Sequence, residues 1–591
     1  MPALKHAPVQ ITARHLADGL KTYAKVTLPP EAMSACSNVR ANKDGGRFPR
    51  PGVEDSQIDY SAYSFIAGRG QISGKSPKKL WLAGDNGTNV KITYVDTDLE
   101  SAQYGVVFDV GLTLTTGKYV QMLEWLGDIY FANGVTVGAV VVGRVATGGV
   151  SAGASELNLR PGNGVKFPAT GSGLIGTDSF SWTGRTADQL TGVTGLAEDH
   201  DAEEVVTHTL TLSPLYCDKA TVIEEWLASL NLGGDPESPF VWEFSKFAFA
   251  SAPENFRDFS GAPANTELVG QGGEIRAFLK TNNFFYVWKE DSLHGTSRSA
   301  VDTDTGARVP QPVDGVQGTP NARTVAKVVD DELVYLATNK RIPEVGTQIV
   351  DGSTKSAPRS TFDSDIEKLI TQIDDLGQQE WVHYNSSEKL LKVRVFESGV
   401  SVVYVKDYNV GEWFRDTNKN FDCICQHGDK SWAFDGSAGK MYIDEIGNFD
   451  DTVPVESDWA TGRMGRGEFE LGKAIYLRMH GYMTLGSIAF VDFYKEDRFQ
   501  FTKMLTDAYV QSTDPSDGVN VGSGGVGNGN SIGSGGGVSK AFPFRFPVGA
   551  NHKGEDFSIR VRMPGENGDF VQFDGFTIGV RPLRRYPSKH A

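Results

Sequence analysis

The feature that most constrains this chain is a plan that recurs along it: an alternating apolar run, a short polar turn and a second alternating run. Residues 274–295 show it as EIRAFLKTNNFFYVWKEDSLHG. Because successive side chains of a strand point to opposite faces, each copy predicts a β-hairpin. Further copies span residues 79–95 (with Asp85-Asn86-Gly87 as the turn), 119–134 (with Gly127-Asp128 as the turn), 324–343, 380–396, 400–416 and 421–445.

The hairpin of residues 274–295 is apolar on both faces. If Asn282-Asn283 is its turn, Phe278, Phe285 and Val287 share one face, and Ala277, Leu279, Phe284, Tyr286 and Trp288 share the other. A small sheet with two apolar faces needs a neighbour on each side. The repeats therefore predict an all-β chain whose small sheets form a β-propeller of about five to seven blades. An ordinary sandwich of hairpins is the alternative.

Two stretches have helical rather than alternating spacing. In residues 360–379 the apolar positions Ile366, Leu369, Ile370, Ile373 and Leu376 follow a helical period, and Ser364 with Glu367 fits a capping box. Residues 219–234 carry a second such stripe and stop at glycine. We expect both to be minor helical insertions that dock on a sheet.

Changes of pattern divide the chain into five parts. We expect an N-terminal arm and the start of the propeller in residues 1–60, and the first blades in 61–145. An insertion or platform region with a short helix would occupy 146–265, and the remaining blades 266–450. Longer alternating strands in 451–591 predict a C-terminal β-sandwich-like region. It contains a Gly-rich stretch, 514–540, that has too few side chains to build a core.

Composition limits the class of protein and its partners. The 68 glycines among 591 residues indicate many turns. The net charge of −17 argues against a basic face that binds duplex DNA, although it would suit a conduit through which DNA slides. No export signal and no membrane span is evident in the sequence. Four scattered cysteines, Cys36, Cys217, Cys423 and Cys425, are expected to be buried thiols rather than a disulfide framework.

No motif demands catalysis. GRGQISGKS (residues 68–76) has Arg69 where a phosphate-binding loop needs glycine, and Ser151 of GVSAG lies in a predicted loop. The acidic runs 198–204 and 302–306 lack the spacing of a calcium loop and are expected to be solvated turns. A glycosidase carboxylate pair stays open, since it is defined by separation in space. We therefore assign no catalytic, cofactor-binding or metal-binding residue and no cofactor.

Six segments, taken in order along the chain, carry a further signal. An Asn-containing segment precedes a turn and Arg-Pro-Gly in SACSNVRANKDGGRFPRPG (residues 34–52). The remaining segments are SFSWTGRTADQLTGVTGL, FFYVWKEDSLHGTSRS, RTVAKVVDDELVYLATNKRIPEV, STFDSDIEKLI and DFSIRVRMPGENGDFVQFDGFTIGVRP. The order of these segments resembles the tail nozzle proteins of short-tailed bacteriophages, also called tail tubular protein B. Residues 143–258 and the Gly-rich stretch depart from the family pattern.

This resemblance implies a virion protein that is made in the host cytoplasm and forms a hexameric ring in the tail. Its expected partners are further copies of itself, the portal and head-to-tail adaptor, tail fibres or spikes, and viral DNA passing through the lumen. No turnover is implied. The alternative is a carbohydrate-binding or depolymerising surface propeller with Trp288, Trp413 and Trp432 as sugar platforms, although their place in alternating strands favours core packing. The basic C-terminal stretch 581–591 would contact an acidic neighbour or fray.

Overall fold

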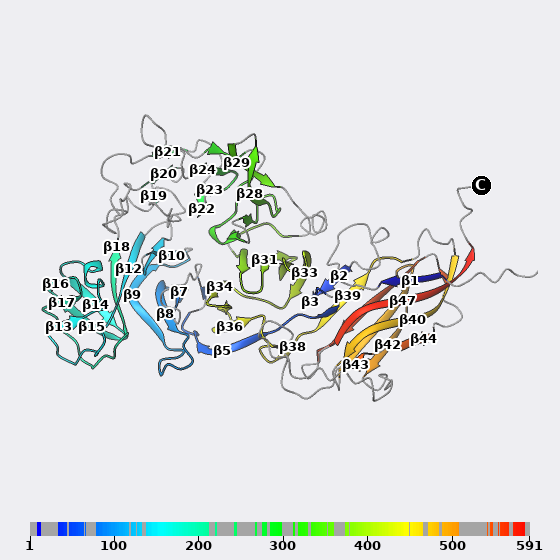
Figure 1. Ribbon diagram of the computed structural model, residues 1–591, viewed down its shortest axis with the longest axis horizontal. Coiled ribbons are helices and arrows are strands. Elements are labelled where there is room, and N and C mark those ends of the chain that lie inside the picture. The colour runs from blue at the N-terminus through cyan, green and yellow to red at the C-terminus, as the bar shows by residue number, and fades with distance from the viewer. Residues whose placement is uncertain are drawn as a thin grey trace, which may run out of the picture.

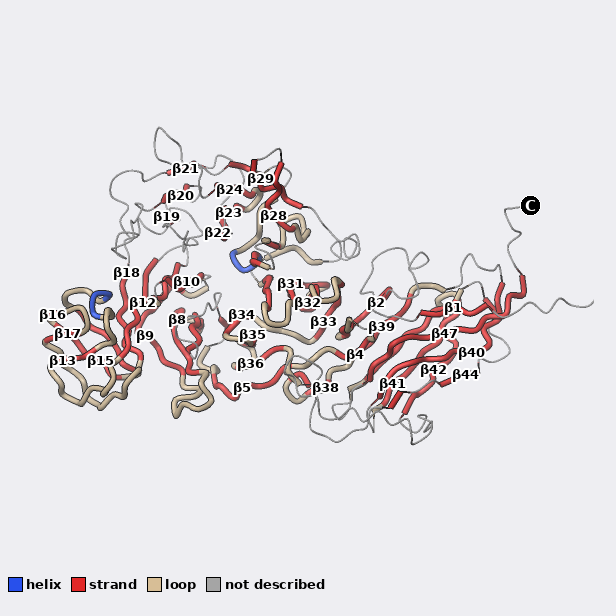
Figure 2. The backbone as a smooth tube through the Cα atoms, in the orientation of Figure 1, coloured by secondary structure: helices blue, strands red, loops and turns tan. Residues whose placement is uncertain are grey.

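The computed structural model is almost entirely β (Figures 1 and 2). In the described part of the chain the only helices are two short 3₁₀ helices, η1 (Gly164–Lys166) and η4 (Ala322–Thr324). The structure describes residues 9–13, 33–43, 46–63, 65–66, 79–117, 120–125, 127–132, 137–211, 219–220, 241–244, 266–268, 275–280, 284–297, 311–313, 317–328, 332–350, 353–359, 373–377, 379–447, 449–464, 471–483, 487–506, 540–541, 544–547, 553–554, 556–565 and 571–584.

Four sheets are built from four strands that are consecutive in the chain and antiparallel. Their strands are β6 (Phe65–Ile66), β7 (Lys79–Asp85), β8 (Asn89–Asp96) and β9 (Val107–Thr115); β22 (Ile275–Lys280), β23 (Phe284–Lys289), β24 (Leu293–Ser297) and β25 (Gln311–Pro312); β26 (Val325–Lys327), β27 (Leu333–Tyr335), β28 (Glu344–Val350) and β29 (Ser353–Arg359); and β30 (Trp381–Asn385), β31 (Leu390–Glu397), β32 (Val400–Asp407) and β33 (Glu412–Thr417). Each is one unit of the repeated plan.

A larger sheet follows β9 and carries an insertion with its own core. It runs in the order β10 (Gln121–Trp125), β11 (Asp128–Ala132), β12 (Val137–Arg144), β18 (Val205–Thr211), β14 (Gly171–Ile175) and β15 (Asp178–Trp182). Two three-stranded sheets complete this part: β13 (Glu156–Asn158), β17 (Gln189–Thr191) and β16 (Gly184–Arg185), and β19 (Lys219–Ala220), β20 (Val241–Phe244) and β21 (Thr266–Leu268). Trp182 and Phe180 lie in the buried cluster of the insertion.

The last small sheet is completed by a strand from near the N-terminus. It contains β34 (Cys423–His427), β35 (Lys430–Asp435), β36 (Lys440–Asp444), β5 (Val53–Asp59), β37 (Phe449–Asp450) and β38 (Val453–Pro454). β5 pairs antiparallel with β36, and Ile58 of β5 lies in one buried cluster with Leu80 of β7 and Trp432 of β35. The first and the last of the small sheets therefore share a core.

The first strands of successive small sheets also touch one another. β22 contacts β26, β26 contacts β30, and β30 contacts β34. In Figure 1 the small sheets follow one another around one half of the molecule, from β7 and β8 through β22 and β28 to β34 and β36.

Two larger sheets form the other half of the molecule (Figure 1). One contains β1 (Val9–Ala13), β3 (Val39–Ala41), β4 (Arg47–Pro49), β40 (Leu471–Met483), β43 (Lys540–Ala541), β44 (Phe544–Pro547), β45 (Lys553–Gly554) and β47 (Val571–Arg584). The other runs β2 (Met33–Ser37), β39 (Ser457–Thr461), β46 (Phe557–Met563), β41 (Ile488–Lys495) and β42 (Arg498–Thr506). They share a buried core in which the rings of Trp459 and Phe573 lie 6.3 Å apart.

The structure confirms the predicted hairpins wherever it describes them. Asp85 pairs with Val90 across the predicted turn, and Gly87 there has φ +83°, which favours glycine. In the hairpin of residues 274–295, Leu279 pairs with Tyr286 and Ala277 with Trp288, as a turn at Asn282-Asn283 requires. The turn of the second hairpin is corrected by one residue, because Trp125 pairs with Asp128 and the connection is 126–127.

The helical predictions need correction where they can be checked. Residues 373–377 are not helical: the backbone N–H of Asp374 bonds to Phe396 O, and the Asp374 carboxylate accepts bonds from the turn at Ser398 and Gly399. These bonds hold the segment against β31 and β32. Ile373 is nonetheless buried in the core, which agrees with docking on a sheet. Residues 219–220 form β19, and the rest of both stretches lies outside the described residues.

Two further expectations concern the thiols and the membrane. Cys36, Cys423 and Cys425 are buried, as predicted, and burial raises the pKa of the Cys36 thiol to about 12. Cys217 lies outside the described residues. Within the part of the chain that is described, no helix is long and apolar enough to cross a membrane.

Candidate functional site: a buried ionic junction and the cleft beside it

The most unusual side chains of this protein are eight charged groups gathered where the small sheets meet the two large ones. Four cations and four carboxylates make up this ionic junction: Arg40, Arg50, Lys392, Lys419, Asp416, Asp444, Glu445 and Asp450. Seven of the eight are at most 4% exposed, and only Asp450 reaches 16%. Charges taken from water at this depth need partners and hydrogen bonds.

Arg40 of β3 joins the N-terminal segment to two of the small sheets. Its Nη1 and Nη2 donate to Asp416 Oδ1 and Oδ2 at 2.7 and 2.8 Å, a bidentate pair with the end of β33. Nη2 also donates to Glu445 Oε1 at 3.1 Å, just after β36.

Two lysines complete the balance from the small sheets. Lys392 of β31 donates to Asp444 and to Glu445 Oε1, the latter at 2.7 Å. Lys419 donates to Asp444 Oδ1 at 2.7 Å and to Glu445 Oε1 at 2.8 Å. β31, β36 and the segment after β33 are thus tied through two shared carboxylates.

Asn38 and Arg50 link this junction to the large sheets. Asn38 Nδ2 donates to Thr417 Oγ1 (3.0 Å) and to Glu456 O (2.8 Å), while its Oδ1 accepts from Arg50 Nε (3.0 Å). Arg50 also donates to both carboxylate oxygens of Asp450. A Cβ on Gly52 would lie 2.0 Å from Phe449 O, so only glycine fits there. The Asn and Arg-Pro-Gly of residues 34–52 are therefore parts of a junction.

The junction shifts the pKa values of its carboxylates. Burial raises the pKa of Asp416, but the charges of Arg40, Lys419 and Arg50 outweigh it and lower that pKa to about 2. At Glu445 burial also raises the pKa, but the charges of Lys392 and Lys419 outweigh burial and hold that pKa well below its usual value. All three carboxylates most deeply buried, Asp416, Asp444 and Glu445, have lowered pKa values.

These shifts predict how stability depends on acid. A carboxyl with a lowered folded-state pKa contributes stability that is complete above its unfolded pKa, about 4, and is lost as pH falls toward the folded value. Asp416 should contribute fully at pH 5–8 and lose its contribution between about pH 4 and 2. The urea midpoint of unfolding of the wild type should exceed that of Asp416→Asn, and this difference should shrink only between about pH 4 and 2. A difference that shrinks between pH 5 and 7 would contradict the lowered pKa of Asp416.

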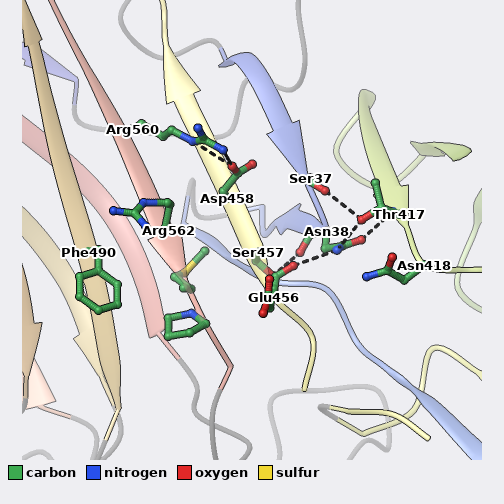
Figure 3. Close-up of a pocket in the computed structure, with 12 residues that line it drawn as sticks. Ser37, Asn38, Thr417, Asn418, Glu456, Ser457, Asp458, Phe490, Arg560 and Arg562 are labelled. Carbon is green, nitrogen blue, oxygen red and sulfur yellow. Dashed lines mark hydrogen bonds and ion pairs between the residues drawn. The ribbon is translucent and has the colours of Figure 1, made fainter. Parts of the chain in front are cut away.

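A cleft of about 350 Å³ lies beside the junction (Figure 3). Arg560 is bound to Asp458, and Arg562 Nε and Nη2 donate to Asp492 at 2.8 and 2.9 Å. The Arg562 guanidinium also lies 5.3 Å from the centroid of the Phe490 ring. The walls of the cleft are formed by Ser37, Asn38, Thr417, Asn418, Glu456, Ser457, Asp458, Phe490, Arg560, Arg562, Met563 and Pro564.

The charged groups of the junction bind the sheets of this chain to one another. Each cation of the junction is buried and already bound to a carboxylate of the same chain, which lowers its capacity to bind a free anion or to act in proton transfer. Among the described residues, no group of three or more His, Cys, Asp and Glu side chains could hold a metal ion. This part of the structure provides a tie between sheets and a polar surface.

A second polar cluster lies within the acidic run 198–204, whose Glu198, Asp199 and Asp201 are exposed as predicted. His200 is buried rather than solvated: its Nε2 lies 3.1 Å from Asp178 Oδ2 and its Nδ1 2.9 Å from Glu204 Oε2. The backbone of His200 also pairs with Val150. The imidazole thus fastens the loop at 198–204 to β15. The reason sequence reasoning missed it is that Asp178 lies 22 residues away.

The other residues singled out from the sequence have plain structural places. Trp288, Trp413 and Trp432 are 0%, 4% and 4% exposed, so core packing is confirmed and these rings offer no platform to a sugar. Ser151 is exposed in a loop flanked by Gly149 and Gly153, both at φ +70°, as expected. Residues 68–76, 302–306, 514–539 and 585–591 lie outside the described residues, while Arg581 belongs to β47 and Lys540 to β43.

Comparisons with known proteins do not place the chain in a family. No family model matches it, and no curated protein matches it. Among solved structures, an exo-β-1,3-galactanase from Phanerochaete chrysosporium is 8% identical at a TM-score of 0.21, covering 90% of this chain and 100% of that one. PorZ, a surface component of the type-IX secretion system of Porphyromonas gingivalis, is 9% identical (TM-score 0.27; 78% and 47%). A putative 6-phosphogluconolactonase from Bacteroides fragilis is 11% identical (TM-score 0.25; 73% and 89%). Similarities this low carry no argument about function.

Proposed function

We propose that this protein is a structural component of a short-tailed phage virion: a tail nozzle that forms a ring below the portal and adaptor, conducts and gates DNA, and carries fibres or spikes. In this proposal the small sheets are the blades of a β-propeller, and the two large sheets form a β-sandwich. The observation that carries it is the pairing of β5 with β36, which joins the beginning of the chain to the last small sheet.

Three features support the propeller within this proposal. Successive small sheets have the four-stranded antiparallel plan of propeller blades. Their first strands contact one another in chain order, as the innermost strands of blades do. A last sheet completed by a strand from near the N-terminus joins the two ends of such a series, and it covers the edge of β36 that would otherwise be open to aggregation.

Other features support a conduit rather than an enzyme. The ionic junction fastens the propeller to the sandwich through paired charges, as suits a protein that bears load. The net charge of −17 would keep the sugar-phosphate backbone of DNA from binding the channel wall. The burial of Trp288, Trp413 and Trp432 removes the feature that favoured a carbohydrate-binding surface.

The proposal predicts assembly. The purified chain, mixed with the portal and adaptor proteins of the same virion, is expected to add as a six-membered ring that is visible by electron microscopy and measurable by native mass spectrometry. The chain alone serves as the control, because ring formation can require the adaptor as a platform. A chain that stays monomeric with its neighbours and degrades polysaccharide would instead establish the depolymerase alternative.

A further inference from the structure

A loop between β8 and β9 presents an unusually exposed apolar side chain. Leu99 is 75% exposed, more than any other large apolar side chain of the described residues, and it stands between Asp98 and Glu100. Val106, at the end of the same loop, is 42% exposed. The loop therefore carries an apolar projection flanked by carboxylates.

This loop is held in shape by its own hydrogen bonds. The backbone N–H groups of Ser101 and Tyr104 donate to Asp98 O and Ser101 O at 2.9 and 3.1 Å. The Asp96 carboxylate accepts from Ser101 Oγ at 2.8 Å and from Lys79 Nζ at 2.6 Å. Tyr104 Oη donates to Ser56 O of β5 at 2.7 Å. A projection fixed in this way loses little conformational entropy on binding, which favours its use as a contact.

A surface of the opposite character covers the outer face of β46, β41 and β42. Arg562 pairs across the sheet with Phe490, and Phe490 with Met504, so these side chains lie on one face in a row. Met504 is 47% exposed, and Phe499 on the same strand is 56% exposed. We call Phe490, Phe499, Met504, Arg560 and Arg562 the arginine–aromatic face.

The exposed charge of this face is positive. Arg560 and Arg562 are 45% and 44% exposed, whereas their partners Asp458 and Asp492 are 22% and 6% exposed. The carboxylates thus lie beneath the guanidinium groups. Arginine, aromatic residues and methionine are the side chains enriched in protein interfaces. The face fits an apolar side chain that carries carboxylates at its sides.

We propose that the loop of residues 96–106 on one copy docks on the arginine–aromatic face of a second copy, with Leu99 against Phe490 and Met504 and with Asp98 and Glu100 toward the arginines. β8 and β9 lie in one half of the elongated molecule and β42 in the other (Figure 1). One copy cannot satisfy both surfaces itself. The contact is heterologous: after it forms, one copy still has a free face and the other a free loop, so further copies can add until the ring closes and every loop and face is used. This inference rests on the proposed function, because it specifies the contact between neighbouring subunits of the proposed ring.

The test uses two full-length variants with opposite defects. Leu99→Arg sets a cation against Arg560 and Arg562, and Met504→Asp sets a carboxylate against Asp98 and Glu100. Each is expected to weaken self-association by roughly 100-fold, measured by sedimentation velocity with and without the adaptor. Each variant keeps the surface that the other lacks, and the introduced arginine and the introduced aspartate carry opposite charges. Mixing the two variants should therefore restore the association that neither shows alone. Val400→Arg, at a position 60% exposed on β32, is the matched control and should associate as the wild type does.

The outcomes separate this inference from the proposed function. Rings that form equally well from wild type and from both variants would overturn the docking but leave the nozzle intact. Restored association in the mixture without any ring in the presence of portal and adaptor would support the docking and overturn the nozzle. Wild-type copies that never associate would overturn both.

Discussion

Lys392→Met is expected to lower the free energy of unfolding around the ionic junction by about 3–5 kcal/mol. Methionine keeps most of the length of the side chain and removes its charge. Asp444 and Glu445, both buried, would then share Lys419 and Arg40 as their remaining cations. The large cost comes from leaving buried carboxylates without enough positive charge, rather than from the strength of one ion pair.

A matched lysine on a strand of the last small sheet provides the control. Lys440 of β36 also lies between two carboxylates, Asp55 at 2.8 Å and Asp451 at 2.9 Å, but it is 40% exposed. Lys440→Met should therefore cost only about 0–1 kcal/mol, because water screens an exposed pair. Equal effects of the two substitutions would show that burial does not set the strength of the junction.

A second substitution tests whether charge balance is the cause. Adding Asp444→Asn to Lys392→Met removes one carboxylate with the cation, and the double variant should recover part of the lost stability. A chain of several packed parts need not unfold in one step, so amide hydrogen exchange in β33 and β36 is the suitable measurement. A double variant less stable than Lys392→Met would contradict this explanation.

The hairpins were predictable from sequence because their information is local. Asp85-Asn86-Gly87 and the alternation around it specify β7, β8 and the turn between them without reference to the rest of the chain. Gly127 and Asp128 were predicted as the two turn residues, but the pairing places the connection at 126–127. The error is one residue because a Gly-Asp pair can also occupy the last position of a turn and the first position of the next strand. Ile373 and Leu376 have helical spacing in the sequence, yet residues 373–377 are not helical, because hydrogen bonds to Phe396 and to the turn at Gly399 fix a different backbone.

The ionic junction could not be predicted because its members are far apart in sequence. Arg40 and Asp416 are separated by 376 residues, and each is an ordinary polar residue in an alternating strand. Only the stretch containing Asn38 and Arg50-Pro51-Gly52 drew notice, and it did so through a family resemblance. Its physical reason, the close approach of Gly52 to Phe449, needs the fold to be seen. The five-part division of the chain stays a prediction.

Ile58→Ala is expected to destabilise the first and last small sheets together, by about 2–4 kcal/mol. Ile58 is 2% exposed on β5, in the cluster that joins Leu80 and Leu82 of β7 to Trp432 and Phe434 of β35. A cavity there weakens the contact that closes the series of small sheets. Amide hydrogen exchange should accelerate in both β7 and β35, about 350 residues apart, and stay unchanged in β47.

The comparison with an exposed position of the same sheet makes this result specific to closure. Val453 of β38 is 59% exposed, and Val453→Ala should change stability by no more than about 0.5 kcal/mol. If Ile58→Ala accelerated exchange in β5 alone, the two ends of the series would be independent, and the proposed propeller would lose its main support. Faster exchange in both β7 and β35 would instead mean that the series of small sheets within one chain closes through β5, because no covalent neighbour of Ile58 lies in either strand.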